Sequence, residues 1–149
     1  MTGKILLDTN VLVYIYAGSD PRKQAIAEEV ADKVIKAAQA VVSTQVLAEF
    51  FNTATRKLGV PPGIAQERLA RYSVLCDVLI ITTDVLITAA RGVIEHQLSF
   101  WDALLWATAL LNQIGYILSE GFQDGIKLEG VRIVNPFTPT FDIGKLKPA

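Results

Sequence analysis

Two acidic side chains stand in apolar surroundings, where an unpaired carboxylate is costly. Asp8 ends the apolar run 5–7, and we expect it at the carboxyl end of a buried strand, where open α/β sheets bind their ligands. Asp102 is the only charged residue in 99–113, and no Lys or Arg stands between residues 91 and 127 to pair with it. Hard cations such as Mg²⁺ and Mn²⁺ prefer carboxylate oxygens. These two acids are therefore candidate metal ligands.

A third acid, Glu49, has weaker support from the sequence. With Gln45, Asn52 and Arg56 it forms a polar stripe on an expected helix, and a solvent-facing side explains such a stripe. Its place one turn into a helix that follows a strand is what makes it a candidate. Asp102 also has an ordinary alternative, because an acid in the first turn of a helix interacts favourably with free backbone N–H groups. A serine just before that helix can cap it, which leaves Asp102 free for a cation.

Short apolar segments alternate with helical patterns along the chain. The expected strands are 4–8, 40–43, 78–81, 116–119 and 131–134, and the expected helices are 10–17, 21–38, 44–58, 61–76, 84–97 and 100–113. The helix caps are expected at Thr9 or Asn10, Ser43 or Thr44, Thr83 or Asp84, and Ser99. Segment 120–130 reads as a loop. This alternation predicts an α/β fold with a central, mostly parallel sheet of about four to five short strands and helices on both faces.

Length and composition narrow the class of protein. A chain of 149 residues that is 51% hydrophobic builds one core, and we expect a single domain over 1–137 with a partly ordered tail, 138–149. A net charge of −1 excludes binding of nucleic acid through bulk positive charge. One cysteine excludes an internal disulfide and favours a reducing compartment. No apolar run reaches membrane-spanning length and the first residues have no signal-peptide core, so we expect a cytoplasmic protein that does not engage a membrane.

Three segments, taken in order, resemble the motifs of the PIN-domain family, and most closely its VapC-type toxins. Residues 8–12, Asp-Thr-Asn-Val-Leu, resemble the opening motif. Residues 43–50, Ser-Thr-Gln-Val-Leu-Ala-Glu-Phe, resemble the second, and residues 100–104, Phe-Trp-Asp-Ala-Leu, the third. The segment 130–137 resembles the end of this subfamily. The resemblance covers roughly residues 4–137 and implies a single PIN-like fold.

The resemblance also implies a function. It implies a metal-dependent ribonuclease that hydrolyses phosphodiester bonds of RNA, with Mg²⁺ or Mn²⁺ held by three acids and with the carboxylates or a bound water hydrogen-bonded by nearby polar side chains. The acids are Asp8, Glu49 and Asp102, and the polar side chains are Asn10 and Ser43 or Thr44. The expected partners are the RNA substrate, an antitoxin protein that covers the acidic pocket, and a second copy of the chain in a homodimer.

One motif departs from the family pattern. The family carries Ser/Thr-x-Asp after the fourth predicted strand, whereas this chain has Ser119, Glu120 and Gly121 there. Glu120 or Asp124 could substitute as a metal ligand, although Asp124 precedes a glycine and Asp-Gly is a turn signature. This departure favours an alternative function, a catalytically weak or inactive PIN-like domain that binds RNA or protein. A phosphatase with Asp8 as nucleophile is disfavoured, because Asn10 stands where that class has a second acid.

Overall fold

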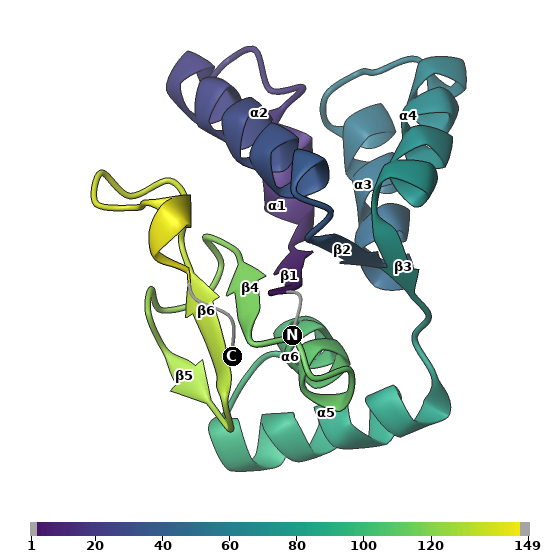
Figure 1. Cartoon of the computed structure of the whole chain (residues 1–149). Coiled ribbons are helices and arrows are strands. Elements are labelled where there is room, and N and C mark those ends of the chain that lie inside the picture. The colour runs from purple at the N-terminus through teal and green to yellow at the C-terminus, as the bar shows by residue number, and fades with distance from the viewer. Residues whose placement is uncertain (1–2, 147–149) are drawn as a thin grey trace.

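The computed structural model describes residues 3–146, so residues 1–2 of the expected domain and 147–149 of the expected tail lie outside the described part of the chain. Within it a central sheet has six strands in the order β3-β2-β1-β4-β6-β5 (Figure 1). The strands are β1 (Ile5–Leu7), β2 (Ala40–Ser43), β3 (Asp77–Leu79), β4 (Tyr116–Leu118), β5 (Lys127–Leu128) and β6 (Val131–Val134). The expected α/β class is confirmed, with one strand more than the upper end of the expected range.

The five longer strands run parallel, and β5 pairs antiparallel with β6. The additional strand lies in the segment 120–130 that was expected to be a loop. It is two residues long and is joined to β6 by Glu129 and Gly130, whose φ angles of 49° and 89° form a tight hairpin turn. A strand this short, beside a turn without the usual Asn-Gly or Asp-Gly signal, leaves little pattern to detect.

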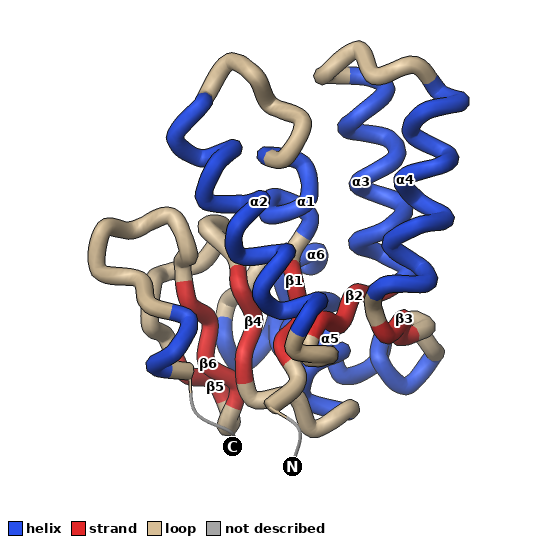
Figure 2. The backbone as a smooth tube through the Cα atoms, turned by 45° about the horizontal axis from the view of Figure 1, so that its top comes forward, coloured by secondary structure: helices blue, strands red, loops and turns tan. Residues whose placement is uncertain are grey.

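Helices cover both faces of the sheet. They are α1 (Thr9–Tyr14), α2 (Pro21–Lys36), α3 (Thr44–Arg56), α4 (Pro62–Leu75), α5 (Thr83–His96) and α6 (Phe100–Leu111), with a short 3₁₀ helix η1 (Ile143–Lys145). Helix α2 lies across one face and α5 and α6 lie on the other, while α3 and α4 stand side by side beyond the β3 end of the sheet (Figures 1 and 2). None of the helices in residues 3–146 is both long and apolar enough to cross a membrane.

The helix caps explain where several elements begin. Ser43 and Ser99 accept hydrogen bonds from backbone N–H groups of α3 and α6, as expected. The expectation of Thr9 or Asn10 as the cap of α1 was wrong, because Asp8 itself accepts from the first N–H of that helix. The cap of α5 is Thr82 rather than Thr83 or Asp84. In both helices the chain turns helical one or two residues earlier than the apolar pattern indicates.

The contact between α5 and α6 depends on Gly92. A Cβ atom at this position would lie 2.7 Å from the Cζ3 atom of Trp106, so the two helices approach as closely as they do because residue 92 has no side chain. Trp106 is fully buried and donates its indole N–H to the carbonyl of Leu128 at 3.1 Å. The ring thereby ties α6 to β5 and holds the α5–α6 pair against the sheet.

The described part of the C-terminal tail packs on the body of the protein. Phe141, Ile143 and Leu146 are partly buried against the core, and Asp142 caps η1 through the N–H of Gly144. Residues 138–146 therefore follow the surface of the domain as a packed extension.

Candidate metal centre

A pocket of about 540 Å³ lies where β1 ends, between α1, α3 and the start of α6. Asp8, Glu49 and Asp102 all line it. They arrive from three elements that are far apart in sequence: Asp8 from the end of β1, Glu49 from the second turn of α3, and Asp102 from the first turn of α6. The fold thus brings together the three acids that the sequence singled out.

Asp8 is held by hydrogen bonds to both of its oxygens. Oδ1 accepts from the backbone N–H of Thr9 at 2.7 Å, as the cap of α1. Oδ2 accepts from Oγ of Ser119 at 2.6 Å and from Nδ2 of Asn10 at 3.3 Å. These contacts fix the direction in which the carboxylate faces the pocket.

The electrostatics of the pocket disfavour negative charge. Burial raises the pKa of Asp8 from 3.8 to about 6; the hydrogen bonds from Ser119 and Thr9 oppose the rise, and the charges of Glu49 and Asp102 add to it. Burial also raises the pKa of Asp102, opposed by a hydrogen bond with Ser99. Carboxyls that repel one another in a partly desolvated pocket favour the binding of a compensating cation.

Glu49 lies on a wall formed by one side of α3. Its Oε1 accepts from the hydroxyl of Thr9 at 3.2 Å. The residues of α3 and its C-terminal cap that line the pocket follow a spacing of four, namely Gln45, Glu49, Thr53 and Lys57. The sequence indicated a solvent-facing stripe of Gln45, Glu49, Asn52 and Arg56. Asn52 and Arg56 are exposed, as that stripe predicts, whereas Gln45 and Glu49 are half-buried and line the pocket.

Two buried amide oxygens in the pocket lack a partner. Oδ1 of Asn10 and Oε1 of Gln45 are buried and accept no hydrogen bond from any described residue, and both residues line the pocket. Buried acceptors are normally satisfied, so these atoms call for a donor from outside the chain, such as the water of a hydrated ion. The donor atoms of the three carboxylates and of these two amide groups are all oxygens. Oxygen ligands are the kind that Mg²⁺ and Mn²⁺ prefer.

The acids as placed do not form a closed set of direct ligands. Within residues 3–146, no three His, Cys, Asp or Glu side chains are arranged so that one ion could be held by all of them at once. Mg²⁺ usually keeps several waters and binds through one or two carboxylates. The residues therefore fit an ion that is held partly through its own waters.

Asn10, Ser43 and Thr44 were expected to support the carboxylates, and they differ in what they contact. Asn10 does contact Asp8. Oγ of Ser43 instead accepts from the N–H of Val46, and Oγ1 of Thr44 accepts from the N–H of Ile81. These two hydroxyls hold α3 and the end of β3, and neither residue lines the pocket.

Thr9 and Ser119 perform the role that was expected of Ser43 and Thr44. Their hydroxyls contact Glu49 and Asp8, respectively. Both stand inside motifs recognisable in the sequence, Thr9 beside the first acid and Ser119 at the start of the run that departs from the family pattern. The sequence therefore showed that these positions carry hydroxyl side chains, but it did not show that they contact Glu49 and Asp8.

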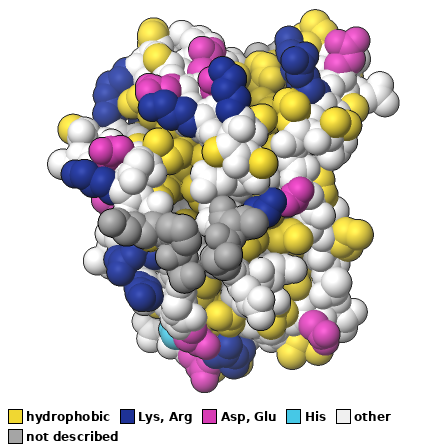
Figure 3. All heavy atoms as spheres, viewed as in Figure 1, with side chains coloured by type: hydrophobic (Ala, Val, Ile, Leu, Met, Phe, Trp, Pro, Cys, Tyr) yellow, Lys and Arg dark blue, Asp and Glu magenta, His cyan; other side chains and the backbone are white. Residues whose placement is uncertain are grey.

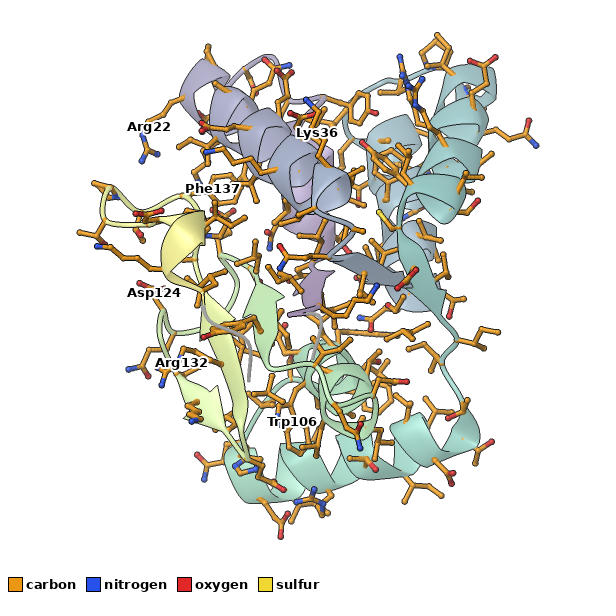
Figure 4. All side chains as sticks on the ribbon, in the orientation of Figure 1. Arg22, Lys36, Trp106, Asp124, Arg132 and Phe137 are labelled. Carbon is orange, nitrogen blue, oxygen red and sulfur yellow. The ribbon has the colours of Figure 1, made fainter. Side chains whose placement is uncertain are left out.

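Glu120 and Asp124, the two possible substitutes for the missing fourth acid, face elsewhere. Glu120 accepts from the Tyr14 hydroxyl and pairs with Nζ of Lys23 at 2.7 Å. Oδ1 of Asp124 accepts from the N–H of Asn135 at 2.8 Å, and Figure 4 shows Asp124 beside β6, across the view from α3. Neither lines the pocket, so the expectation that one of them replaces the acid is not supported by their contacts.

Gly121, the residue at the position of that acid, does line the pocket. A Cβ atom there would meet only Oγ of Ser119, at an ordinary 3.5 Å. Gly121 is also outside the positive-φ region that favours glycine. The backbone therefore leaves room for a side chain where this chain carries none.

The surface charge agrees with the near-neutral composition. On the face shown in Figure 3, Lys and Arg side chains are dispersed among acidic ones rather than gathered into one basic patch. In the pocket, Lys57 is the one Lys or Arg among the lining residues. Any polyanion that enters the pocket must be held by a cation or by contacts other than bulk charge.

Several solved structures share the fold of this chain. No protein of curated function matches the sequence. The solved structure of the Mycobacterium tuberculosis toxin VapC20, described as cleaving the sarcin-ricin loop, is similar with a TM-score of 0.62 and 22% identity over 76% of this chain and 87% of that one. A toxin–antitoxin complex from Klebsiella pneumoniae gives a TM-score of 0.64 at 19% identity, over 89% and 98% of the two chains.

A third similar structure is DNA-bound VapBC from Salmonella typhimurium, with a TM-score of 0.64 and 14% identity over 89% of this chain and 98% of that chain. Identities this low show a shared fold. The family itself is shown by the sequence, because the family model of the PIN domain matches residues 5–123. That match contains all three acids of the pocket. The chain belongs to the PIN domain family.

Proposed function

We propose that the chain is a metal-dependent endoribonuclease that hydrolyses phosphodiester bonds in RNA and acts as the toxin of a toxin–antitoxin pair. The convergence of Asp8, Glu49 and Asp102 in one pocket at the end of β1 carries the proposal. The PIN fold and the similarity to VapC structures, one of them described as a sarcin-ricin loop cleaving toxin, support the substrate class.

Asp8, Glu49 and Asp102 would hold Mg²⁺ or Mn²⁺, directly or through its waters. When bound, the ion supplies a water of lowered pKa and positive charge near the scissile phosphate. The chain's own residues orient the site. Ser119 and the Thr9 N–H direct the Asp8 carboxylate, and the Thr9 hydroxyl directs Glu49.

The two unpartnered amide oxygens extend this arrangement. Oδ1 of Asn10 and Oε1 of Gln45 can each accept a hydrogen bond from a water or a ribose hydroxyl that enters the pocket. Gly121 supplies no carboxylate, and Glu120 is paired with Lys23. We therefore propose a site that holds a single ion.

Cleavage of RNA tests the proposal. Wild type is expected to cut single-stranded RNA with Mg²⁺ or Mn²⁺ and to be silent in EDTA, while Asp8→Asn, Glu49→Gln and Asp102→Asn each lose activity by at least about 100-fold, as expected when a metal site is disrupted. Asp124→Asn is the matched control, because Asp124 lies outside the pocket and asparagine keeps its acceptor. Equal cutting by wild type and Asp8→Asn, or none by wild type with either metal, would overturn the proposal.

The alternative is a catalytically inactive PIN domain that binds RNA or protein. Gly121 at the position of the fourth acid is the observation that favours it. The two functions separate in one comparison: an inactive binding module retains RNA or protein in a binding assay but shows no metal-dependent cleavage and no growth arrest when it is expressed in bacteria. A nuclease toxin arrests growth, and Asp8→Asn abolishes the arrest.

The proposed partners follow from the same similarity. An antitoxin protein that covers the pocket is supported by the toxin–antitoxin complexes among the similar structures. A homodimer is the proposed assembly, and sedimentation velocity on the isolated chain measures it. The proposed location is the cytoplasm, which the single, buried Cys76 favours.

A further inference from the structure

Trp101 is a large aromatic side chain that the fold leaves open to solvent. Its side chain is 62% exposed, whereas the other tryptophan, Trp106, is 0% exposed. The backbone around it is well held: Ser99 caps the start of α6, and the carbonyl of Trp101 accepts from Nε2 of Gln45 at 3.2 Å. Phe100 packs against the ring at a centroid distance of 5.5 Å. Trp101 is therefore an exposed aromatic surface on a fixed helix start.

That surface belongs to the acidic pocket. Trp101 lines the same pocket as Asp8, Glu49 and Asp102 and immediately precedes Asp102 in the chain. The opposite end of the pocket is marked by Lys57, the last member of the α3 wall that begins at Gln45. Twelve residues at about 1.5 Å each place Lys57 about 18 Å along the helix from Gln45, which is long enough for a short strand rather than one nucleotide.

The net charge of the chain's own side chains does not supply the affinity of this pocket for RNA. Three acids and one lysine line it, and the chain has a net charge of −1. Proteins that bind single-stranded RNA commonly stack unpaired bases on aromatic side chains, and this contact tolerates any base. The exposed ring of Trp101 offers such a contact next to the acids that would hold the ion.

We infer that Trp101 is a stacking platform for one unpaired base of the RNA substrate, and that Lys57 contacts a phosphate on the other side of the acidic cluster. The inference rests on the proposed function, since it names how the same pocket would take its substrate. It assigns the substrate class as RNA that is unpaired at the cleavage site, because a base within a duplex has its faces covered by its neighbours.

Binding without cleavage tests this inference independently of catalysis. The probes are a fluorescein-labelled single-stranded oligouridine and an abasic oligoribonucleotide of equal length, titrated in Ca²⁺ and followed by anisotropy. Trp101→Ala is expected to weaken binding of oligouridine by roughly 5- to 150-fold, the equivalent of about 1–3 kcal/mol per stacked base. Trp101→Phe should keep most of the affinity for oligouridine. Trp101→Ala should leave the affinity for the abasic probe unchanged, because that probe has no base to stack.

Two further variants sharpen the test. Ile94→Ala is the matched control, because Ile94 is 78% exposed on α5 and lies outside the pocket lining; its affinity is expected to equal that of wild type. Lys57→Gln weakens both probes and lowers the salt slope by about one unit, as loss of one phosphate contact should. Oligouridine also quenches tryptophan fluorescence in wild type but not in Trp101→Phe, since Trp106 is buried.

The outcomes are distinct. Equal binding of oligouridine by wild type and Trp101→Ala, or an equal loss on both probes, overturns the stacking role while cleavage by wild type still stands. A Trp101→Ala variant that changes the sedimentation coefficient but not RNA affinity identifies the ring as a protein contact and likewise overturns it. If wild type binds neither probe, the inference fails whatever the cleavage assay gives. Stacking without any cleavage supports the inference and removes the nuclease function.

Discussion

Replacing Asp8 by asparagine should stabilise the metal-free protein at neutral pH. The fold raises the pKa of Asp8 from 3.8 to about 6, chiefly because the carboxyl is buried, with a contribution from the charges of Glu49 and Asp102. Asparagine keeps an oxygen that can accept from the N–H of Thr9 and is itself a good helix cap, but it carries no charge. The substitution therefore removes the cost of ionising a buried carboxyl while keeping the start of α1.

The pKa shift sets both the size and the pH dependence of the gain. The folded-state pKa lies above the unfolded value, so the folded protein binds this proton more tightly. Stability is then lost as the pH rises from 3.8 to about 6. The loss amounts to about 3 kcal/mol at pH 8, where both states are ionised, but to only about 0.5 kcal/mol at pH 4. Asp8→Asn should recover these amounts, less a cost that does not depend on pH, because the amide nitrogen that replaces Oδ2 cannot accept the hydrogen bond from Nδ2 of Asn10.

Urea unfolding in EDTA at pH 4 and pH 8 measures the effect. The free energy of unfolding of Asp8→Asn minus that of wild type cancels the titration of the other groups, and Asp124→Asn serves as a control that should show no gain at either pH. Adding Mg²⁺ should reverse the order at pH 8, because an ion at about 1,000 times its Kd adds about 4.1 kcal/mol to the wild type alone, which exceeds the gain of the variant. A gain that is equal at both pH values, or a loss at pH 8, would refute the reasoning.

Three other substitutions have expected outcomes. Gly121→Asp adds a carboxylate to the pocket and should tighten Mg²⁺ binding at least about fivefold by calorimetry, since one charge at about 4 Å contributes about 1–4 kcal/mol; weaker binding would contradict this. Gly92→Ala drives a methyl group into Trp106 and should lower the free energy of unfolding by about 1–3 kcal/mol; unchanged urea unfolding would show that the helices separate freely. Ser119→Ala removes a hydrogen bond that lowers the pKa of Asp8, so that pKa should rise above its wild-type value in a carboxyl NMR titration, and an unchanged pKa would count against this contact.

The class of fold and two of the acids, Asp8 and Asp102, could be predicted because they leave local signals in the sequence. Apolar strands of four or five residues, serine caps and a lone acid on an apolar helix are visible without knowledge of tertiary contacts. Asp102 was found through the cost of its burial, and the structure does bury part of it. Glu49 needed the resemblance, because a residue on a polar stripe looks the same whether the stripe faces solvent or a pocket.

What the sequence could not provide were contacts across the sheet. Ser119 follows β4 and reaches Asp8 at the end of β1 because β4 and β1 are neighbours, and strand order has no local signature. Glu120 was a reasonable metal ligand by residue type, yet its side chain pairs with Lys23 of α2 and does not line the pocket. Asp8 was recognised as an acid but missed as a cap, since one side chain performs both tasks.

That double task has a consequence for the entropy of binding. A free aspartate side chain samples several rotamers, and fixing it upon capture of a ligand costs conformational entropy. Asp8 loses that freedom during folding, since the hydrogen bonds to Thr9 and Ser119 fix both of its oxygens. The loss of conformational entropy therefore lowers the stability of the folded chain and does not occur again each time an ion binds. An incoming ion would meet a donor that is already immobile, and the orientation of that donor would persist after the ion departs.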